Sequence, residues 1–342
     1  MKALVLEEIG KLVLRDVEMP ETQPDEILVK VEACGICGTD RHLLHGEFPA
    51  APPVTLGHEL TGVVQSVGAK VRSIRPGMRV TCDPNIACGI CPECRDGHVN
   101  LCRNLRAIGI HRNGGFAEYV AMPETQAVVL PDALDPLYGA LCEPLACCLH
   151  GVDLANIRTG SSVAVLGGGV IGLLVVQLAR LAGATNVVLL TRSAEKRKLA
   201  EGIGATATID PSDEAALAEA LAEGGLLASG AHTVFECAGV AETVKLSPSL
   251  ARRGGTVVIL GVLPQGEKVE IEPFDILFRE IKLIGSFVNP FTQTRAAGLI
   301  ASGAIKVEPL ITRKIGFSEA LETIHAPAPG GEIRALLVPS LG

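Results

Sequence analysis

The glycine-rich segment Gly167–Gly172 constrains the fold of this chain more than any other part of the sequence. It follows a strand-like apolar run at Val163–Leu166 and opens a helix-like segment at Val170–Leu181. The glycines have the spacing G-x-G-x-x-G, in which the first permits a tight turn and the last lets a helix pack closely on a strand. This order of strand, glycine turn and helix predicts a βαβ unit.

Strand-like and helix-like segments continue to alternate beyond this turn. They cover the ranges Val187–Leu190, Ala194–Ile203, Ala207–Asp210, Ala215–Glu223, His232–Cys237, Thr256–Leu260 and Ile281–Gly285. Such alternation predicts an α/β domain with a doubly wound parallel sheet whose strands are joined by helices. The chain before about Ala140 is different, because its apolar runs are interrupted by prolines, which is typical of a β-rich domain.

A glycine turn of this kind also predicts a binding site for a dinucleotide. Gly169 would let the backbone approach a pyrophosphate, and the N–H groups at Val170 and Ile171 would face its charge. Gly167 and Gly172 would supply the turn and the close helix packing. A purely structural glycine turn is the alternative, but the surrounding strand–helix–strand series favours the dinucleotide.

The residues after the next strand indicate which dinucleotide binds. A site for NAD usually offers an acidic residue to the ribose about twenty residues beyond the glycine turn. This chain has Thr191, Arg192 and Ser193 there, followed by Lys196 and Arg197. Hydroxyl and cationic groups would bind a 2′-phosphate through charge-assisted hydrogen bonds, so the sequence favours NADP over NAD. A solvated basic turn is the alternative.

Composition and charge argue against several other classes of protein. The net charge is −8 and aromatic residues make up only 3%, and both features disfavour a nucleic-acid partner. Ser161–Ala179 is uncharged and has the length of a membrane span, but its glycines divide it, so we expect no membrane segment. Glu7 and Glu8 interrupt the region where a signal peptide would be apolar. With 11 cysteines, an odd number, the chain is expected to be cytoplasmic and free of disulfides.

Four cysteines form a compact metal-binding motif. Cys88, Cys91, Cys94 and Cys102 have the spacing C-x2-C-x2-C-x7-C. Four thiolates at this spacing can surround one zinc ion and leave no open coordination position, so we predict a structural zinc that orders its own loop. The alternatives are four unrelated thiols and a zinc ribbon that binds nucleic acid.

A second group of candidate metal ligands is spread along the chain. Cys37 lies in a glycine-rich segment, His58 and Glu59 follow a glycine, and Glu143 lies where the α/β region begins. A mixed set of sulfur, nitrogen and oxygen ligands is more typical of a catalytic than of a structural zinc. Taken singly, each of these residues could be an ordinary core residue.

These motifs, in this order, resemble the zinc-containing medium-chain dehydrogenase/reductase superfamily, especially its polyol (sorbitol-type) and threonine dehydrogenase branches. The resemblance covers essentially the whole chain. Its marks are Gly35–Asp40, Gly57–Glu59, the four-cysteine lobe, Gly115–Tyr119, Glu143–Leu145 and the glycine turn. The resemblance implies a GroES-like β-rich catalytic domain at 1–145, a Rossmann cofactor-binding domain at 146–287 and a return to the catalytic domain at 288–342.

The resemblance also implies roles for individual residues. Cys37 and His58 would bind a catalytic zinc, with Glu59 or Glu143 as a further ligand, directly or through water. Thr39 would begin a proton relay. Further cofactor-binding positions are Cys237, Gly261 and Val262.

The implied activity is hydride transfer between NADP(H) and a secondary alcohol or its ketone, with a polyol or sugar alcohol as the first choice of substrate. Threonine is the second choice, and His42 lies where threonine dehydrogenases carry a histidine. The competing hypotheses are an NAD-using relative, a zinc-independent reductase of the superfamily and a zinc-ribbon module. The resemblance further implies two zinc ions per chain and a homo-oligomer, either a dimer or a homotetramer.

Overall fold

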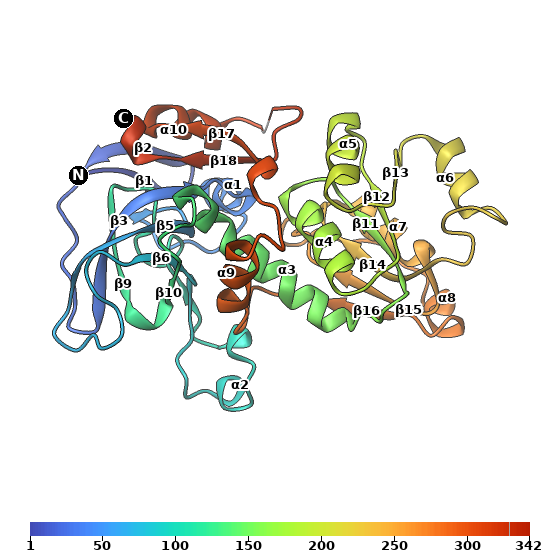
Figure 1. Cartoon of the computed structure of the whole chain (residues 1–342), viewed down its shortest axis with the longest axis horizontal. Coiled ribbons are helices and arrows are strands. Elements are labelled where there is room, and N and C mark those ends of the chain that lie inside the picture. Colours follow the sequence, from blue (N-terminus) through green and yellow to red (C-terminus); the bar gives the residue numbers. More distant parts are fainter. Residues whose placement is uncertain (328) are drawn as a thin grey trace. The chain divides into compact units, whose positions relative to one another are not determined.

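The structure, a computed structural model, describes residues 1–327 and 329–342. Its contacts divide the chain into two compact units (Figure 1). The first unit combines Met1–Ala146 with Val288–Gly342, so it is built from two separate stretches of sequence, and the second unit is Cys147–Phe287. A β-rich unit and an α/β unit with a parallel sheet confirm the predicted fold class.

The first unit is built around a seven-stranded sheet in the order β10-β6-β5-β3-β18-β17, with β9 also paired to β3. These strands are β3 (Glu26–Gly35), β5 (Glu59–Val67), β6 (Arg79–Cys82), β9 (Tyr119–Pro123), β10 (Ala127–Val129), β17 (Ile311–Ile315) and β18 (Arg334–Leu337). Two smaller sheets contain β1 (Lys2–Glu8), β2 (Lys11–Asp16) and β4 (Val54–Thr55), and β7 (Asn85–Ile86) and β8 (Arg106–Ala107). The helices are α1 (Gly38–His45), α2 (Pro92–Arg95), α9 (Gln293–Ala301) and α10 (Phe317–His325), with 3-10 turns η1 (Val99–Leu101), η2 (Glu124–Gln126), η3 (Pro136–Leu141), η4 (Glu308–Leu310) and η5 (Pro339–Leu341).

Strand β3 organises the core of this unit. Its apolar side chains Ile27, Val29 and Val31 recur at every second position and are at most 3% exposed, as expected for one buried face of a strand. β18 runs antiparallel to the end of β3, with Leu336 opposite Gly35. The late segment of the chain therefore lies directly beside the residues that follow β3.

The second unit contains a six-stranded parallel sheet in the order β13-β12-β11-β14-β15-β16. Its strands are β11 (Ser162–Leu166), β12 (Asn186–Leu190), β13 (Ala207–Ile209), β14 (Ala231–Glu236), β15 (Ala251–Ile259) and β16 (Lys282–Gly285). The connecting helices are α4 (Val170–Leu181), α5 (Ala194–Ile203), α6 (Glu214–Leu221), α7 (Ala241–Leu250) and α8 (Pro273–Phe278), and α3 (Cys142–Ala155) leads into the unit.

One strand of the second unit begins well before its predicted position. β15 begins at Ala251 rather than at Thr256, because Arg252–Gly255 lacks the apolar pattern by which a strand is recognised. Residues Val163–Leu166 of β11 are completely buried, which is typical of a parallel sheet covered on both faces. No helix in the described ranges is long and apolar enough to cross a membrane.

We predict that Gly172→Ala destabilises the second unit. A Cβ at Gly172 would lie 1.9 Å from the carbonyl oxygen of Gly167, so α4 would have to move away from the strand–helix turn. Unfolding in urea, followed by circular dichroism, should show a loss of about 1–3 kcal/mol, typical of overpacking. Gly202→Ala is the matched control, because this helical glycine has no atom within 4 Å of its Cβ position, and it should be neutral or stabilising. Equal effects of the two changes would contradict the packing argument.

Candidate functional site

Cys37, His58 and Glu59 form a cluster at one end of the large sheet of the first unit. Cys37 precedes α1, directly after β3 ends at Gly35, and His58 and Glu59 lie at the start of β5. The two strands are antiparallel, with Gly35 opposite Glu59, and this register brings the three side chains together. Their candidate ligand atoms all lie within 4.8 Å of one another. Two segments about twenty residues apart in sequence thus supply sulfur, nitrogen and oxygen donors to one point.

Gly35 provides the space for the carboxylate of this cluster. A Cβ at this position would lie 2.1 Å from Glu59 Oε2. Glu59 is 1% exposed and His58 is 5% exposed, so both are shielded from water. The sequence identified Gly35 only as part of a motif. The structure shows why a glycine is needed there, because any side chain would collide with the carboxylate of Glu59.

Asp40 is a further member of the cluster that sequence reasoning did not assign a role. Its Oδ2 accepts a hydrogen bond of 2.8 Å from the backbone N–H of Cys37, and its Oδ1 lies 3.6 Å from Nδ1 of His58. A carboxylate beside one ring nitrogen is the usual partner of a metal-ligating histidine, because it fixes the tautomer and leaves the other nitrogen for the metal. Thr39 lies beside the cluster, with Oγ1 at 3.6 Å from Cys37 Sγ.

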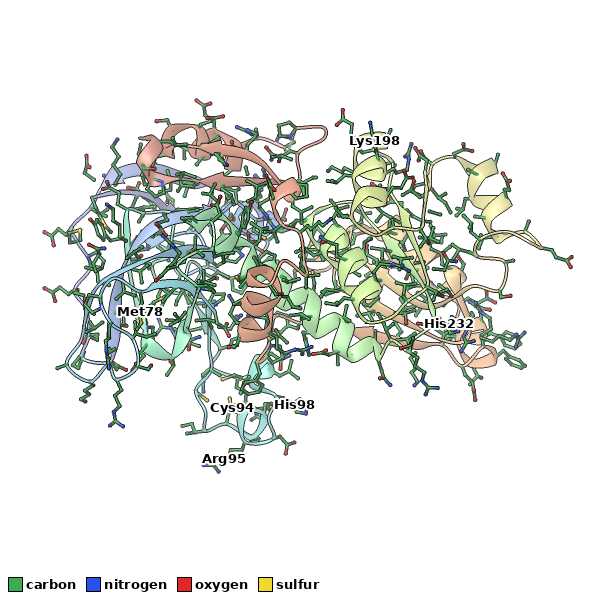
Figure 2. All side chains as sticks on the ribbon, in the orientation of Figure 1. Met78, Cys94, Arg95, His98, Lys198 and His232 are labelled. Atoms are coloured by element: carbon green, nitrogen blue, oxygen red, sulfur yellow. The ribbon has the colours of Figure 1, made fainter. Side chains whose placement is uncertain are left out.

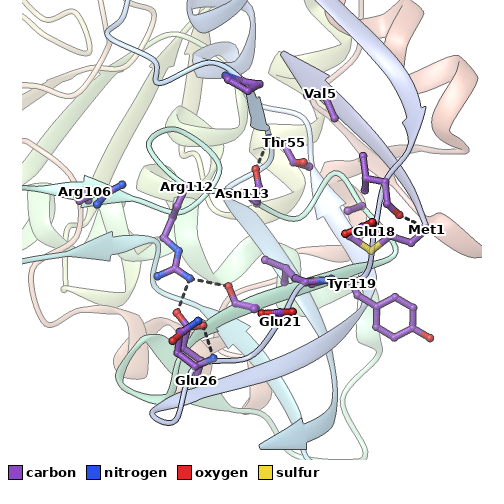
Figure 3. Close-up of a pocket in the computed structure, with 18 of the residues that line it drawn as sticks. Met1, Val5, Glu18, Glu21, Glu26, Thr55, Arg106, Arg112, Asn113 and Tyr119 are labelled. Atoms are coloured by element: carbon purple, nitrogen blue, oxygen red, sulfur yellow. Dashed lines mark hydrogen bonds and ion pairs between the residues drawn. The ribbon is translucent and has the colours of Figure 1, made fainter. Parts of the chain in front are cut away.

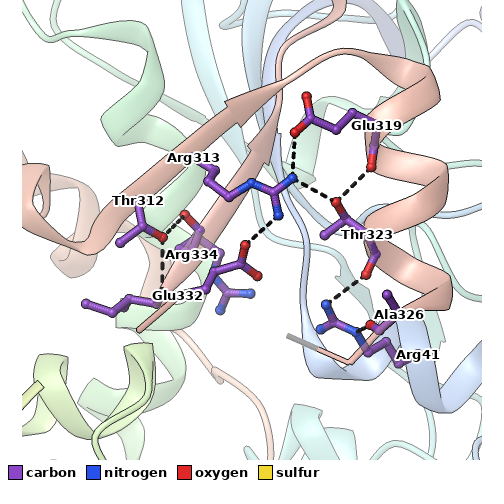
Figure 4. Close-up of polar contacts among 9 residues, drawn as sticks. Arg41, Thr312, Arg313, Glu319, Thr323, Ala326, Glu332 and Arg334 are labelled. Carbon is purple, nitrogen blue, oxygen red and sulfur yellow. Dashed lines mark hydrogen bonds and ion pairs between the residues drawn. The ribbon is translucent and has the colours of Figure 1, made fainter. Parts of the chain in front are cut away.

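Arg334, the first residue of β18, places a buried positive charge against the cluster. It is 4% exposed, and its Nη2 lies 3.1 Å from Glu59 Oε1. Its Nη1 donates to the carbonyl oxygen of Ile36, so the guanidinium also holds the chain next to Cys37. Figure 4 shows Arg334 near Arg313 of the neighbouring strand β17. Arg313 forms ion pairs with Glu319 and Glu332. The sequence alone assigned Arg334 no role.

Several buried polar atoms of the cluster lack a protein partner. In the described part of the chain, six buried side-chain atoms have none, and four of these lie here: Asp40 Oδ1, His58 Nδ1, Glu59 Oε2 and Arg334 Nε. Buried polar atoms are rarely left unpaired, so a concentration of them indicates that a bound group completes the site. Burial alone would lower the pKa of His58, but the nearby acidic groups of Asp40 and Cys37 outweigh it and raise the pKa well above its usual value. The surroundings thus favour positive charge, and the donor set fits zinc.

Glu143 lies outside this cluster in the structure. It is 7% exposed, in the first turn of α3, and its charge acts on the buried thiol of Cys82. The group of atoms within 4.8 Å of one another contains Glu59 and not Glu143. Of the two acidic residues that the sequence left open, Glu59 is therefore the one placed beside Cys37 and His58.

The four cysteines Cys88, Cys91, Cys94 and Cys102 also converge. Their sulfur atoms lie within 4.8 Å of one another, in a lobe formed by α2 and η1, and Figure 2 labels Cys94 there. Backbone N–H groups of Ile90 and Cys91 lower the pKa of Cys88 to about 6, which favours its thiolate form. The lobe has little apolar interior of its own, since Ile90 is 70% exposed and Leu101 is 53% exposed. A metal bound by the sulfur atoms would supply the stability that such a lobe lacks.

Two other polar features of the first unit lie apart from these ligand sets. His42 pairs with Glu47 and makes an edge contact with Phe48 at 5.8 Å between ring centroids. A cavity of about 780 Å³ borders the segment before β3, and in it Arg112 pairs with Glu26 at 2.6 Å (Figure 3). The side chains of His42 and Arg112 are therefore already engaged by partners within the protein.

In the second unit, the predicted dinucleotide loop connects β11 to α4. Gly167 has φ of 107°, a conformation that favours glycine, and a Cβ there would lie 2.8 Å from the backbone nitrogen of Ala238. Gly169 caps α4, and no atom lies within 4 Å of its Cβ position, so the approach to the N–H groups at Val170 and Ile171 is open. This is the space that a pyrophosphate would fill.

The other predicted cofactor-binding residues border the same edge of the parallel sheet. Cys237 follows β14, while Gly261 and Val262 follow β15, so all three lie at carboxyl ends of strands, as the glycine loop does. Ligands of doubly wound sheets bind at this edge. A buried carboxylate that sequence reasoning missed orders it: Glu236 Oε1 accepts hydrogen bonds from the N–H groups of Ala238 and Gly239 at 2.8 and 3.0 Å.

The residues after β12 differ in what they can offer a 2′-phosphate. Arg192 is exposed, and its guanidinium has no hydrogen bond or ion pair within the described ranges. Arg197 is engaged, because its Nη1 donates to the carbonyl oxygens of Thr191 and Arg192 at 2.7 and 2.9 Å and pairs with Asp210 at 3.0 Å. Ser193 caps α5. Arg197 thus shapes the loop, and Arg192 presents a free cation.

Comparison with known proteins places this geometry in context. The family model described as alcohol dehydrogenase GroES-like domain matches residues 23–132, and the one described as zinc-binding dehydrogenase matches residues 170–301. D-arabitol-phosphate dehydrogenase from Enterococcus avium is 33% identical, over 94% of this chain and 92% of its own. Sorbitol dehydrogenase from Halalkalibacterium halodurans is also 33% identical, over 99% of each chain.

A solved structure is more similar still. It is a Sinorhizobium meliloti 1021 protein described as a zinc-binding dehydrogenase and crystallised with NADP bound. It is 64% identical to this chain, covers 99% of both chains and superposes with a TM-score of 0.97.

We predict that Arg334→Met destabilises the first unit in metal-depleted protein. The change leaves the Glu59 carboxylate buried without its counter-charge, which typically costs about 3–5 kcal/mol. Urea denaturation should show this loss, and added zinc should recover part of it, because a bound cation compensates the same carboxylate. Arg15→Met is the control, because its side chain is 56% exposed and its partner Glu7 keeps a second ion pair with Lys11, so the loss of this exposed pair should cost far less. Equal losses in the two variants would contradict the role of Arg334.

Proposed function

Because the chain belongs to the zinc-type medium-chain dehydrogenase family, in its polyol dehydrogenase-like branch, we propose that it oxidises a polyol at a secondary alcohol carbon, or reduces the matching ketone, with NADP(H). The chain is a zinc-dependent dehydrogenase, and the proposal concerns its substrate, its cofactor preference and the residues that act. Oxidation moves a hydride from the alcohol carbon to the nicotinamide ring of NADP⁺ and releases the hydroxyl proton.

The convergence of Cys37 with the buried residues His58 and Glu59 is the observation that carries the proposal. These residues would hold the catalytic zinc, with Glu143 as the alternative acidic ligand. When bound, zinc supplies Lewis acidity that lowers the pKa of a substrate hydroxyl. The charges balance: the Cys37 thiolate, Asp40 and Glu59 carry three negative charges, and Arg334 with a divalent cation carries three positive ones. A buried site needs such a balance because an uncompensated charge is costly.

The protein residues around the set orient the donors and move the proton. The carboxylate of Asp40, whose Oδ1 lies 3.6 Å from Nδ1 of His58, would orient the imidazole and leave the opposite ring nitrogen for the metal. Arg334 holds Oε1 of Glu59, which leaves Oε2 as its available oxygen. Thr39, whose hydroxyl lies beside Cys37 Sγ, would accept the proton of the substrate hydroxyl and pass it on.

The second unit would bind NADP at the carboxyl edge of its sheet. The N–H groups at Gly169–Ile171 would bind the pyrophosphate, and Cys237, Gly261 and Val262 would border the rest of the dinucleotide. Thr191 and Arg192 would bind the 2′-phosphate, while Arg197 keeps their backbone in place. Support comes from the free guanidinium of Arg192 and from the NADP bound to the Sinorhizobium meliloti protein.

A polyol is the substrate class that the relatives support best. Two relatives in two different bacteria act, by name, on D-arabitol phosphate and on sorbitol, which share a chain of secondary alcohols. Threonine has less support, because neither of these two relatives is named for it and His42, the residue that suggested it, pairs with Glu47. We further propose a second, structural zinc in the four-cysteine lobe, a cytoplasmic location and a homo-oligomer, for which the exposed edge strand β16 offers unpaired backbone groups.

We predict that Cys37→Ala and Cys94→Ala each remove one of two zinc ions, with different consequences. Elemental analysis should give about two zinc ions per chain before either change and about one after it. Cys37→Ala should abolish polyol oxidation but leave the lobe resistant to proteolysis, because only the catalytic set is broken. Cys94→Ala should expose the lobe to proteolysis, because its metal contributes most of its stability. Full turnover in Cys37→Ala with one zinc ion fewer would overturn the proposal.

We predict that Arg192→Gln weakens the use of NADP and spares that of NAD. Loss of one hydrogen bond to a charged group is worth about 1.5–3 kcal/mol, so the KM for NADP should rise by about 10- to 150-fold. Lys198→Gln is the control, because this lysine lies on the exposed face of α5 and should change neither KM (Figure 2). Equal changes in the KM values for both cofactors would refute the assignment of Arg192.

A further inference from the structure

The α/β unit has a cavity at the edge of its sheet where the strands begin, opposite the dinucleotide loop. We call it the amino-edge pocket. Its volume is about 390 Å³, and it is lined where strands begin: by Ser161 before β11, His232 in β14, Arg252 in β15 and Lys282 in β16. All six strands are parallel, so their amino ends share one edge and the glycine loop, which follows the end of β11, lies at the other. The pocket is therefore separate from the proposed NADP site.

The charges that line the amino-edge pocket are of one sign. Arg158, Arg252 and Lys282 line it, and no acidic residue does. Within the described ranges, none of these three side chains forms a hydrogen bond or ion pair with the protein. Such a concentration of free cations is notable in a chain with a net charge of −8. Local fields of this kind attract anions.

Several other arginines of the same unit are already engaged, with Arg192 as the exception. Arg197 pairs with Asp210, and Arg279 pairs with Asp275 and donates to backbone carbonyl oxygens. Arg180 donates to the carbonyl oxygens of Ala184 and Thr185. The free cations at the amino-edge pocket therefore do not reflect a general lack of partners in this unit.

His232 adds a neutral donor to this lining. Its Nδ1 accepts a hydrogen bond of 3.1 Å from the backbone N–H of Ser162, which can only donate, so the ring proton must be on Nε2. Burial and the charge of Arg252 lower the pKa of His232, so the neutral form prevails at neutral pH. Nε2–H has no protein acceptor in the described part of the chain and is free to donate to a ligand. Figure 2 labels His232, near the start of β14.

The remaining lining is apolar and larger than a bare anion requires. Leu154, Ile157 and Ile284 contribute to it. Guanidinium groups match phosphate oxygens well, and a phosphate monoester carries nearly two negative charges at neutral pH. We propose that the amino-edge pocket binds a phosphate dianion through Arg158, Arg252, Lys282 and His232, either as free phosphate or as the head of a small organic phosphate that contacts the apolar lining.

The test is a calorimetric titration of the zinc-loaded chain saturated with NADP⁺, so that the dinucleotide site is already filled. Inorganic phosphate and phenyl phosphate are the probes, at constant ionic strength set with sodium chloride. We expect saturable binding in the millimolar range or tighter. Tighter binding of phenyl phosphate assigns the pocket to an organic phosphate, and equal binding assigns it to free phosphate. Absence of phosphate binding in the presence of NADP⁺ would overturn the proposal.

Variants locate the binding within the molecule. Arg252→Gln and Lys282→Gln should each weaken phosphate binding by about tenfold or more, because each removes one charge-assisted contact. Arg253→Gln is the matched control, because Arg253 is adjacent and exposed but does not line the pocket, and its guanidinium donates to the carbonyl oxygen of Phe278. All three variants should keep the wild-type dissociation constant for NADP⁺ and the same elution volume. Unchanged phosphate binding in both Arg252→Gln and Lys282→Gln would overturn the proposal, whatever the activity with polyols.

Discussion

The pairing of Glu59 with Arg334 is the interaction on which the candidate metal site of the first unit depends. The carboxylates of Asp40 and Glu59 are buried beside the half-buried thiol of Cys37, and burial of like charges is unfavourable without compensation. The guanidinium compensates one carboxylate and binds the carbonyl oxygen of Ile36. The antiparallel pairing of β18 with β3 brings it there. The need for a positive charge beside Glu59 thus gives a reason for β18 to lie next to β3.

In the second unit, the parallel direction of the strands separates the dinucleotide loop from the amino-edge pocket. A parallel sheet has all its carboxyl ends at one edge, and here that edge carries the glycine loop and the backbone turns held by Glu236. The amino ends carry Arg252 and Lys282 instead. Backbone N–H groups predominate where the strands end, and free cations predominate where the strands begin. Both suit anions, but the first offers directional hydrogen bonds to an extended dinucleotide and the second a concentrated field.

Sequence patterns predicted what depends on local spacing. The glycine turn, the alternation of strands and helices, and the four-cysteine motif each lie within a short stretch, so the fold class could be predicted from them. Asp40, Arg334 and Glu236 could not be assigned a role, because each acts through partners that only the folded chain supplies. Arg334 lies 298 residues from Ile36, and no periodicity links them. Arg197 shows the converse: its proximity to Arg192 suggested a shared role, yet its contacts are with the loop backbone and Asp210.

The distance in sequence between Ile36 and Arg334 has a consequence for biosynthesis. Chains emerge from the ribosome with the N-terminal part first, so Cys37, Asp40 and Glu59 are made long before their counter-charge exists. Until Arg334 is made, the pairing of β3 with β5 would bury the carboxylate of Glu59 without this counter-charge, which is unfavourable. During synthesis, closure of this end of the sheet would therefore wait for the last part of the chain, or for a cation that takes the place of the guanidinium.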